Sequence, residues 1–228
     1  MATAAQLAGN AAPSEAAQCD DRVVPAGAPG YESLKRALDV VGACILLVVL
    51  SPVMLLTAAA IKLTSRGPAL FRQVRAGRGG KPFTMYKFRS MRNGAQEQRP
   101  LVQPMNVQAG PVFKIPDDPR VTRVGRFLRR SSIDELPQLI NVLRGEMSLV
   151  GPRPLWLPEA QAATGAARYR TAVKPGLTCL WQISGRSELG YDEWVRLDLY
   201  YITHRSTWLD LLVLVQTLPV VLSARGAY

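Results

Sequence analysis

The sequence contains a single histidine, His204, which is too few for a multi-histidine metal centre. Nothing around it suggests a catalytic triad. Cysteine is scarce as well, and the three that are present lie far apart, at Cys19, Cys44 and Cys179. They have neither metal-ligand spacing nor the density of a disulfide framework, which indicates a reducing compartment. Histidine- or cysteine-based metal sites and disulfide-stapled folds are therefore excluded.

Nucleotide-binding glycine motifs are also missing. No Gly-x-Gly-x-x-Gly fingerprint occurs, and the glycine-rich residues 76–80 are followed by Lys-Pro rather than by Lys-Ser or Lys-Thr, so they form no P-loop. Glycines at a tight connection instead predict a β-hairpin, with strands at residues 71–75 and 83–91. Residues 86–89 alternate aromatic and basic side chains, a pattern that fits phosphate or nucleic-acid contact and a half-exposed strand equally well.

Acidic residues are outnumbered, with 17 against 28 lysines and arginines, and the formal net charge is +11. Such a charge calls for an anionic partner: nucleic acid, a membrane surface or a phosphorylated substrate. The length of 228 residues fits one domain or two small ones, and 48% apolar residues are ample for a core. Residues 1–30, rich in alanine, proline and glycine, predict a disordered tail and lack the pattern of a secretory signal.

Charge is absent altogether from residues 40–61, an apolar segment long enough to span a bilayer. Ser51 and Pro52 lie at its middle, and an internal proline removes a helix hydrogen bond and kinks the helix. Basic residues flank the segment on both sides: Lys35, Arg36, Lys62, Arg66, Arg72 and Arg75. A spanning helix should instead show a bias of lysine and arginine to one side. The pattern fits a re-entrant hairpin broken at Ser51-Pro52 and a kinked transmembrane helix equally well.

The rest of the chain predicts mainly helices and loops. Residues 93–116 are polar and irregular and predict a loop. Residues 120–130 interleave apolar and basic side chains at helical spacing, which is typical of a membrane-surface or phosphate-binding helix and also of a solvated basic face. Further helices are expected at residues 155–170, 191–204 and 208–222, the last of them packed on the domain or lying at the membrane interface.

Two adjacent carboxylates, Asp134 and Glu135, precede an apolar helical pattern that ends at Gly145. If Asp134 is the N-cap, Pro137 falls at the third helical position, where no backbone N–H is needed. The helix dipole then favours ionised carboxylates, and an ionised aspartate there can attack an electrophile beside a bound phosphate. The competing interpretation is structural, because Ser132-Ile-Asp-Glu135 also matches a helix capping box.

These pieces, in this order, resemble the bacterial sugar transferase family, the monotopic polyprenyl-phosphate phosphoglycosyl transferases. The resemblance covers residues 31–225, and the combination of motifs makes it specific. The matching motifs are Lys35-Arg-x-x-Asp39, Ser51-Pro52, Tyr86-Lys-Phe-Arg-Ser-Met91, Asp118-Pro-Arg-Val-Thr122, Gly125-Arg-Phe-Leu-Arg129, Asp134-Glu-Leu-Pro-Gln138, Asn141-Val-Leu-Arg-Gly145, Gly151-Pro-Arg-Pro154, Lys174-Pro-Gly-Leu-Thr178, Trp181-Gln182, Gly185-Arg186 and Asp198-x-x-Tyr201.

The resemblance implies an α+β, mostly helical fold. It would be a membrane-associated single domain with a small β-hairpin and interfacial amphipathic helices. A re-entrant helix-break-helix hairpin would occupy residues 31–66, with its break at Ser51-Pro52, and a catalytic domain would occupy residues 67–228. The expected location is the cytoplasmic face of the bacterial inner membrane. Full-length family members carry a further transmembrane bundle before this domain, so we expect the minimal form.

The resemblance also implies a reaction, the transfer of a phospho-sugar from a UDP-sugar to undecaprenyl phosphate with Mg²⁺. This would be the first membrane step of exopolysaccharide or O-antigen synthesis, with glucose or galactose as the sugar. Asp134 would attack the β-phosphate, release UMP and hold the phospho-sugar covalently until undecaprenyl phosphate takes it. Glu135 would ligate Mg²⁺. The residues expected at the phosphates or the donor are Lys87, Arg129, Arg153 and, in a loop where an ordinary arginine is the alternative, Arg186.

Two alternatives stay open from the sequence. One is a basic membrane-anchored protein that binds anionic lipid or nucleic acid, which the net charge allows. The other keeps the enzyme but makes Asp134 a general base in a ternary complex. Under the favoured reading the partners are the UDP-sugar, undecaprenyl phosphate and inner-membrane lipids, without nucleic acid; the oligomeric state stays open.

Overall fold

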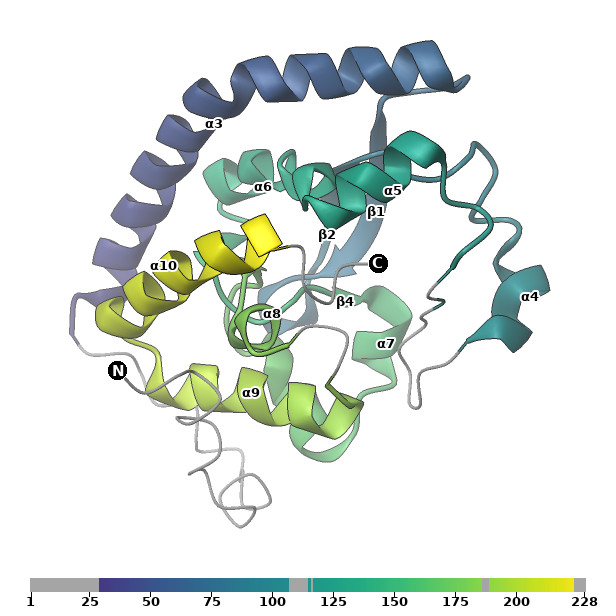
Figure 1. Cartoon of the computed structure of the whole chain (residues 1–228). Helices are drawn as coiled ribbons and strands as arrows, with labels where there is room; N and C mark the ends of the chain where they lie inside the picture. The colour runs from purple at the N-terminus through teal and green to yellow at the C-terminus, as the bar shows by residue number, and fades with distance from the viewer. Residues whose placement is uncertain (1–28, 107–114, 116, 186–188, 224–228) are drawn as a thin grey trace.

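The structure, a computed structural model, describes residues 29–106, 115, 117–185 and 189–223. Helices dominate and the sheets are small, as the sequence predicts (Figure 1). With η for a 3₁₀ turn, the elements are α3 (Tyr31–Thr64), β1 (Leu70–Ala76), η1 (Arg78–Gly80), β2 (Pro82–Phe88), α4 (Arg99–Val102), η2 (Gln103–Met105), α5 (Arg123–Arg130), η3 (Ile133–Glu135), α6 (Gln138–Arg144), β3 (Ser148–Val150), β4 (Leu155–Trp156), α7 (Leu157–Gln161), η4 (Gly165–Thr171), β5 (Gly176–Thr178), α8 (Leu180–Ile183), α9 (Tyr191–His204) and α10 (Thr207–Ser223). The predicted tail lies outside the described residues except for residues 29 and 30.

The long apolar helix α3 is bent rather than broken. It is one continuous helix with Pro52 inside it, and among the described helices it alone is long and apolar enough to cross a membrane. Figure 1 shows it running along one side of the molecule and then turning across the top. Pro52 accounts for the bend because it cannot donate a helix hydrogen bond. The Ser51 hydroxyl donates to the carbonyl of Val48 at 2.8 Å, so the expected helix-break-helix is a hydrogen-bonded kink.

The first arm of α3 is fixed to the domain by buried polar contacts. Asp210 of α10 is 6% exposed and accepts hydrogen bonds from Tyr31 (2.9 Å), Lys35 (2.8 Å) and Tyr201 (2.7 Å). A buried carboxylate is tolerated only when it is paired in this way. Asp210 therefore joins three helices, which explains an acidic residue in an otherwise apolar α10 and packs that helix on the domain, one of the two predicted placements.

The same arm also reaches the end of α6. The Arg36 guanidinium donates to the carbonyls of Val142 at 2.6 Å and Leu143 at 2.8 Å, both in the last turn of the helix, and the Val142 carbonyl also accepts from the N–H of Gly145 at 3.0 Å. Gly145 ends α6 with φ 79, the left-handed conformation predicted for a helix stop. The second arm of α3 packs Ile61 against Phe88 and Leu128. One bent helix thus braces the chain on both sides of η3.

Two small sheets complete the frame. β1 and β2 form the predicted hairpin, paired from Leu70 with Phe88 to Ala76 with Pro82, and β4 adds to the other edge of β1. β3 and β5 pair in parallel. The second strand ends at Phe88, three positions before the predicted residue 91. Met91 makes an isolated bridge to Val121 instead.

The predictions for the later chain hold in part. Residues 191–204 form α9 as predicted, and α10 matches the last predicted helix within one residue at each end. The predicted helix at 155–170 is wrong: the structure has β4, α7 and η4 there, and Gly165 adopts a left-handed φ of 54 that interrupts a helix.

The predicted loop at 93–116 contains the short α4 and η2 within its described part. The predicted helix at 120–130 begins only at Arg123, because Thr122 caps it through the N–H of Gly125 at 2.9 Å.

Candidate active site

The two adjacent carboxylates lie in the 3₁₀ turn η3, between α5 and α6. Asp134 is therefore not the N-cap of α6, which begins at Gln138 with Pro137 before it. Ser132 has φ 57 and its side chain makes no capping hydrogen bond, so the capping-box interpretation is wrong. The left-handed residue turns the chain sharply after α5. This turn presents both carboxylates to a cavity instead of to the helix end.

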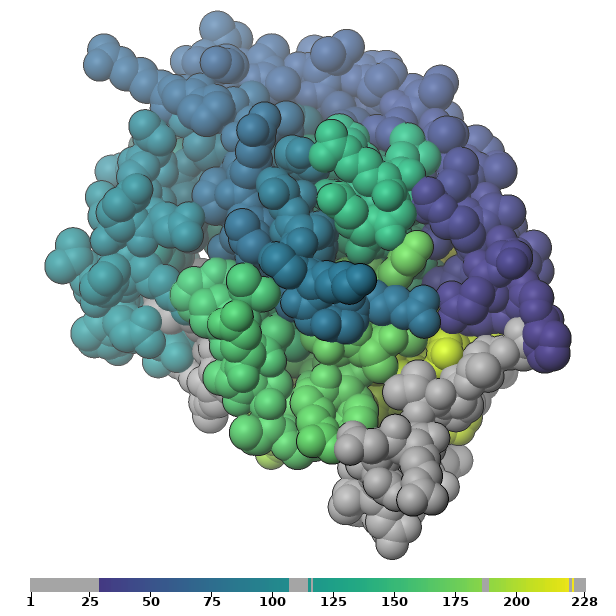
Figure 2. All heavy atoms as spheres, turned by 180° about the vertical axis from the view of Figure 1, so that it is seen from behind, coloured from purple at the N-terminus to yellow at the C-terminus, as the bar shows by residue number. Residues whose placement is uncertain are grey.

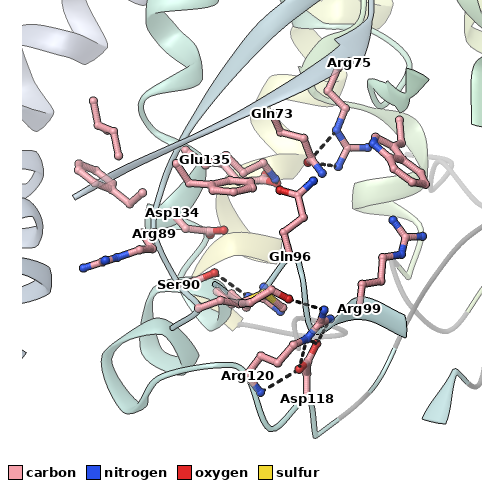
Figure 3. Close-up of a pocket in the computed structure, with 18 of the residues that line it drawn as sticks. Gln73, Arg75, Arg89, Ser90, Gln96, Arg99, Asp118, Arg120, Asp134 and Glu135 are labelled. Carbon is pink, nitrogen blue, oxygen red and sulfur yellow. Dashed lines mark hydrogen bonds and ion pairs between the residues drawn. The ribbon is translucent and has the colours of Figure 1, made fainter. Parts of the chain in front are cut away.

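The cavity has a volume of about 580 Å³. Asp134 and Glu135 lie on its wall, and Figure 3 shows the side chain of Gln96 extending toward Glu135, with Arg120 and Asp118 farther away. In the space-filling view of Figure 2 a hollow separates the teal segment that carries α4 from the green segment of α7. A volume of this size accommodates a small-molecule ligand.

Glu135 is held by two cations. Its Oε1 lies 2.8 Å from Lys87 Nζ of β2 and 3.4 Å from Arg153 Nη2. All three side chains line the cavity. Burial lowers the pKa of Lys87, while the charge of Glu135 opposes that shift. The fold thus brings together two predicted phosphate contacts and one of the predicted catalytic carboxylates.

Asp134 is buried, with 8% exposed, and faces the cavity without a hydrogen-bond partner among the described residues. Burial, followed by the neighbouring charge of Glu135, raises the pKa of Asp134 to about 6. Lys87, Arg129 and Arg153 pull this pKa back down. An ionised carboxylate with no hydrogen bond to satisfy it is a strong nucleophile or base toward a group that enters the cavity.

Arg129 reaches the site because α5 approaches the end of β2 very closely. Its Nε donates to Ser90 Oγ at 2.9 Å, and both residues line the cavity. A side chain at Gly125 would place its Cβ only 1.8 Å from the Ser90 carbonyl oxygen. Only glycine permits this approach. Burial lowers the pKa of Arg129.

Asn141 is fully buried and fixes the position of α6 relative to β2, a role that the sequence did not reveal. Its Nδ2 donates to the carbonyl of Thr84 at 2.7 Å, and its Oδ1 accepts from the N–H of Tyr86 at 3.1 Å. Tyr86 precedes Lys87 in β2, so this clamp sets the distance between Lys87 and Glu135. Only the tertiary pairing of a strand with a helix shows this function.

Behind Arg153 lies a column of stacked side chains. The Arg153 guanidinium is 5.4 Å from the Trp181 ring centroid, and Trp181 stacks on Trp194 at 4.9 Å. Arg170 covers the far face of Trp194 at 4.4 Å and forms a fully buried ion pair with Asp198 at 2.7 Å. Each contact is of a type that stabilises aromatic clusters. The arginine–tryptophan column thus connects the core to the Glu135 partner.

A second polar group of residues lines the end of the cavity near β4. Arg75 donates to Gln73 Oε1 at 2.7 Å and to the Pro154 carbonyl at 3.3 Å. The Arg99 guanidinium lies 4.1 Å from the centroid of the Trp156 ring. Figure 3 shows Gln73, Arg75 and Arg99 on the side of the cavity opposite Asp134.

The donor set fits Mg²⁺ without forming a complete cage. Among the described residues no cluster of three or more acidic, histidine or cysteine side chains can hold a metal ion. Mg²⁺ in phosphate-transfer sites is commonly bound by one or two carboxylates together with substrate phosphates and water. Asp134 and Glu135 supply two hard oxygen donors on one cavity wall. Burial raises the pKa of Asp134 most and the charge of Glu135 adds to it, and a cation beside the pair would offset this second effect.

The remaining predicted residues lie elsewhere. Ser51 and Pro52 are on α3, which contributes no described residue to the cavity wall. Arg186 lies outside the described residues. Of the predicted site, the structure therefore brings together Lys87, Asp134, Glu135, Arg129 and Arg153.

Comparison with known proteins gives concordant matches. A family model described as "Bacterial sugar transferase" matches residues 30–224. The chain is 45% identical over 194 residues to the galactosyl transferase CpsE of Streptococcus agalactiae, covering 85% of this chain and 43% of that protein. It is 42% identical over 203 residues to the undecaprenyl-phosphate galactose phosphotransferase of Salmonella typhimurium, covering 86% and 42%. It is 47% identical over 206 residues to the UDP-glucose:undecaprenyl-phosphate glucose-1-phosphate transferase of Caulobacter vibrioides, covering 85% and 72%. The chain thus spans less than half the length of the first two relatives.

Proposed function

The chain belongs to the bacterial sugar transferase family, and on this premise we propose that it is a phosphoglycosyl transferase. It moves a sugar phosphate from a UDP-sugar to undecaprenyl phosphate, the transfer that the names of two relatives state. Those names specify galactose in one case and glucose in the other, and we propose a hexose of this kind as the sugar. The product is the first lipid-linked intermediate of an exopolysaccharide or O-antigen.

The observation that supports this function best is the state of Asp134. It is a buried carboxylate that faces the cavity with no hydrogen-bond partner among the described residues, and three cations limit the rise of its pKa to about 6. A general base or a structural acid is normally held by a hydrogen bond, whereas a nucleophile needs its oxygen lone pairs directed at the substrate. The surrounding cations suit a substrate that carries phosphate.

In the first step a carboxylate oxygen of Asp134 attacks the β-phosphorus of the donor. The bond between this phosphorus and the oxygen that bridges to the α-phosphate breaks, and UMP leaves with that oxygen and its electron pair. The sugar phosphate stays on Asp134 as an acyl phosphate ester. Lys87, Arg129 and Arg153 offset the charge that develops on the phosphate oxygens.

In the second step an oxygen of undecaprenyl phosphate attacks the same phosphorus. The bond to Asp134 breaks, the carboxylate is regenerated and the product is undecaprenyl diphosphate bearing the sugar. Glu135 is held by Lys87 and Arg153. We assign it to Mg²⁺, beside the reacting phosphate. When bound, Mg²⁺ supplies positive charge that neutralises the pyrophosphate.

We propose that α3 enters the membrane from the cytoplasmic face and returns to it. The bend at Pro52 and the exposed apolar side chains on both arms support this, among them Val48 at 75% and Leu56 at 71% exposed. On α5, Phe127 is 64% exposed, and on α10, Trp208 is 70% exposed, so both helices offer apolar groups to the interface. The active site then faces the cytoplasm, where UDP-sugars are present.

Intact-protein mass spectrometry tests the covalent mechanism directly. Detergent-solubilised protein is incubated with Mg²⁺ and UDP-glucose or UDP-galactose, without the lipid acceptor. The expected result is a mass gain of one hexose phosphate, present in the parent protein and absent from Asp134→Asn. Asp192→Asn, an exposed acidic residue in the first turn of α9, is the matched control and should show the same gain as the parent.

The outcomes separate the alternatives. UMP release that occurs only after polyprenyl phosphate is added, without a mass gain, would replace the nucleophile by a general base in a ternary complex. Absence of both mass gain and UMP release with every donor, while the protein still binds anionic vesicles, would leave a membrane-anchored binding protein.

A further inference from the structure

Gln182 in α8 presents an amide with no hydrogen bond to the cavity. The residue is 6% exposed and lines the cavity, yet its side chain has no hydrogen-bond partner among the described residues. A side chain this little exposed normally has hydrogen-bond partners within the folded protein, and the cavity is the space open to this amide. Such a group at a cavity wall indicates that a ligand completes its hydrogen bonds.

The neighbouring aromatic rings cannot take that ligand on their faces. Trp181 is covered by Arg153 on one side and by Trp194 on the other. Trp194 is covered in turn by Trp181 and Arg170, and it is 7% exposed. The column is therefore a closed wall, and Gln182 is the group on α8 whose amide oxygen and nitrogen are both available for hydrogen bonding.

Resting on the proposed function, we propose that Gln182 is the residue that recognises the hydroxyl groups of the donor's hexose. The wall adjoins the reacting group, since Trp181 lies under Arg153 and Arg153 contacts Glu135 at 3.4 Å. The hexose is bonded directly to the β-phosphate that Asp134 attacks, whereas the nucleoside is separated from it by the α-phosphate. A group on this wall is thus closer to the hexose than to the base.

The chemistry of the amide matches a sugar. Adjacent hydroxyl groups each donate and accept, so the oxygen and the NH₂ group of one glutamine can bind two of them. The cations Lys87, Arg129 and Arg153 suit phosphates, and an uncharged group beside them suits the uncharged part of the donor. Glucose and galactose differ in the direction of one hydroxyl, and a site that hydrogen-bonds a hydroxyl rejects the isomer that leaves its polar groups unpaired. Gln182 therefore contributes to the discrimination between the two hexoses.

The test compares Gln182→Ala with the parent and with Gln161→Ala, an exposed glutamine of α7 outside the cavity wall. The rate of UMP release is measured with UDP-glucose and with UDP-galactose, together with inhibition by UMP. In Gln182→Ala we expect the KM for the preferred donor to rise about tenfold, the loss of one or two uncharged hydrogen bonds. The ratio of kcat/KM between the two donors should move toward one, and the inhibition constant of UMP should stay unchanged.

Because the donor ratio is measured on one preparation, it does not depend on the fraction of variant that folds. Gln182→Asn, which keeps the amide but shortens it, provides a second variant with the same expected direction. An unchanged donor ratio in both variants would overturn the inference. A parallel rise in the UMP inhibition constant would overturn it too, because it would place the uridine at Gln182. If the parent and Gln161→Ala released no UMP from any donor, the proposed function itself would be wrong. If both were active and only the expected effects of the Gln182 variants were missing, the inference alone would be wrong.

Discussion

At the scale of single residues, the chemistry depends on an imbalance around Asp134. Burial and the charge of Glu135 raise its pKa to about 6, and Lys87, Arg129 and Arg153 keep it from rising further. At neutral pH the carboxylate is therefore ionised while it lies in a place that disfavours the charge. Ionisation without solvation is the state in which a carboxylate is most reactive toward phosphorus.

This predicts a pH dependence of the reaction. An acid that must be ionised loses activity as the pH falls through its pKa, so kcat/KM for the donor should rise with pH through about 6 and then level off. In Lys87→Met a cation that lowers the Asp134 pKa is gone, so the midpoint should move to higher pH. Initial rates of UMP release over the range of about pH 5 to 8 give both midpoints.

His204 is the control for this experiment, because an ordinary histidine titrates in the same range. It is exposed at the end of α9, outside the cavity wall. His204→Gln should leave the profile unchanged. A midpoint that disappears in His204→Gln, or one that does not move in Lys87→Met, would show that Asp134 is not the titrating group.

Local charge patterns singled out Asp134, Glu135 and Arg153, and the family resemblance added Lys87 and Arg129. The structure brings all five to one cavity, and their catalytic roles stay predictions. Local patterns were insufficient for Asn141 and Gln182. The role of Asn141 arises from a strand that packs on a helix, and the role of Gln182 depends on which neighbours leave its amide unpaired. Neither relation is encoded in local spacing. The expected N-cap at Asp134 was wrong because Ser132 takes a left-handed conformation that no periodicity predicts.

At the scale of elements, the site is assembled by close approaches between α5, β2 and the bent helix α3. The hairpin and the helices α9 and α10 were predictable, because hydrophobic residues recur with the period of a strand (2 residues) or of a helix (3.6 residues). The segment at 155–170 was not, because its polar and alanine-rich sequence allows a helix while Gly165 interrupts it.

Gly125 offers a test of the close approach. In Gly125→Ala the new Cβ would meet the Ser90 carbonyl oxygen at 1.8 Å, so α5 must move and carry Arg129 with it. We expect a loss of roughly 1–3 kcal/mol in stability, seen as a lower Tm, and a larger loss in kcat/KM than in membrane binding. Gly190→Ala, where no atom of the described residues lies within 4 Å of the added Cβ, should change the Tm little.

Pro52 offers a test of the bent helix. In Pro52→Ala the helix hydrogen bond is restored, so α3 should straighten into a spanning helix. Cysteines introduced on the two flanks, labelled in spheroplasts with a membrane-impermeant maleimide, report the side on which each flank lies. The expected result is protection of both flanks in the parent and labelling of one flank in the variant, with Val53→Ala behaving as the parent. Protection of both flanks in Pro52→Ala would show that the proline does not set the topology.

At the scale of the whole molecule, a net charge of +11 attracts both the donor and an anionic membrane. The composition already predicted an anionic partner, but it could not distinguish a nucleotide sugar from nucleic acid. The cavity favours the former, because its volume of about 580 Å³ suits a small molecule.

Ionic strength should therefore weaken donor capture. Added salt screens the field of the protein and of the cavity cations, so kcat/KM for the UDP-sugar should fall as NaCl rises from roughly 50 to 300 mM, while kcat at saturating donor changes less. Initial rates at each salt concentration measure this, and sucrose at matched osmolality is the control. A kcat/KM that does not respond to salt would mean that long-range attraction contributes nothing to donor binding.

The arginine–tryptophan column has a practical meaning for anyone who wishes to redirect the protein to another donor. Its rings are closed on both faces and its far end is anchored by the buried pair of Arg170 and Asp198. Substitutions in the column that alter donor selectivity would also lower the stability of the fold. Variation is tolerated more readily across the cavity, at the turn that carries Gln96 and the start of the short helix α4 at Arg99. A library that randomises those two segments while it holds the column constant would explore new sugars on a scaffold that still folds.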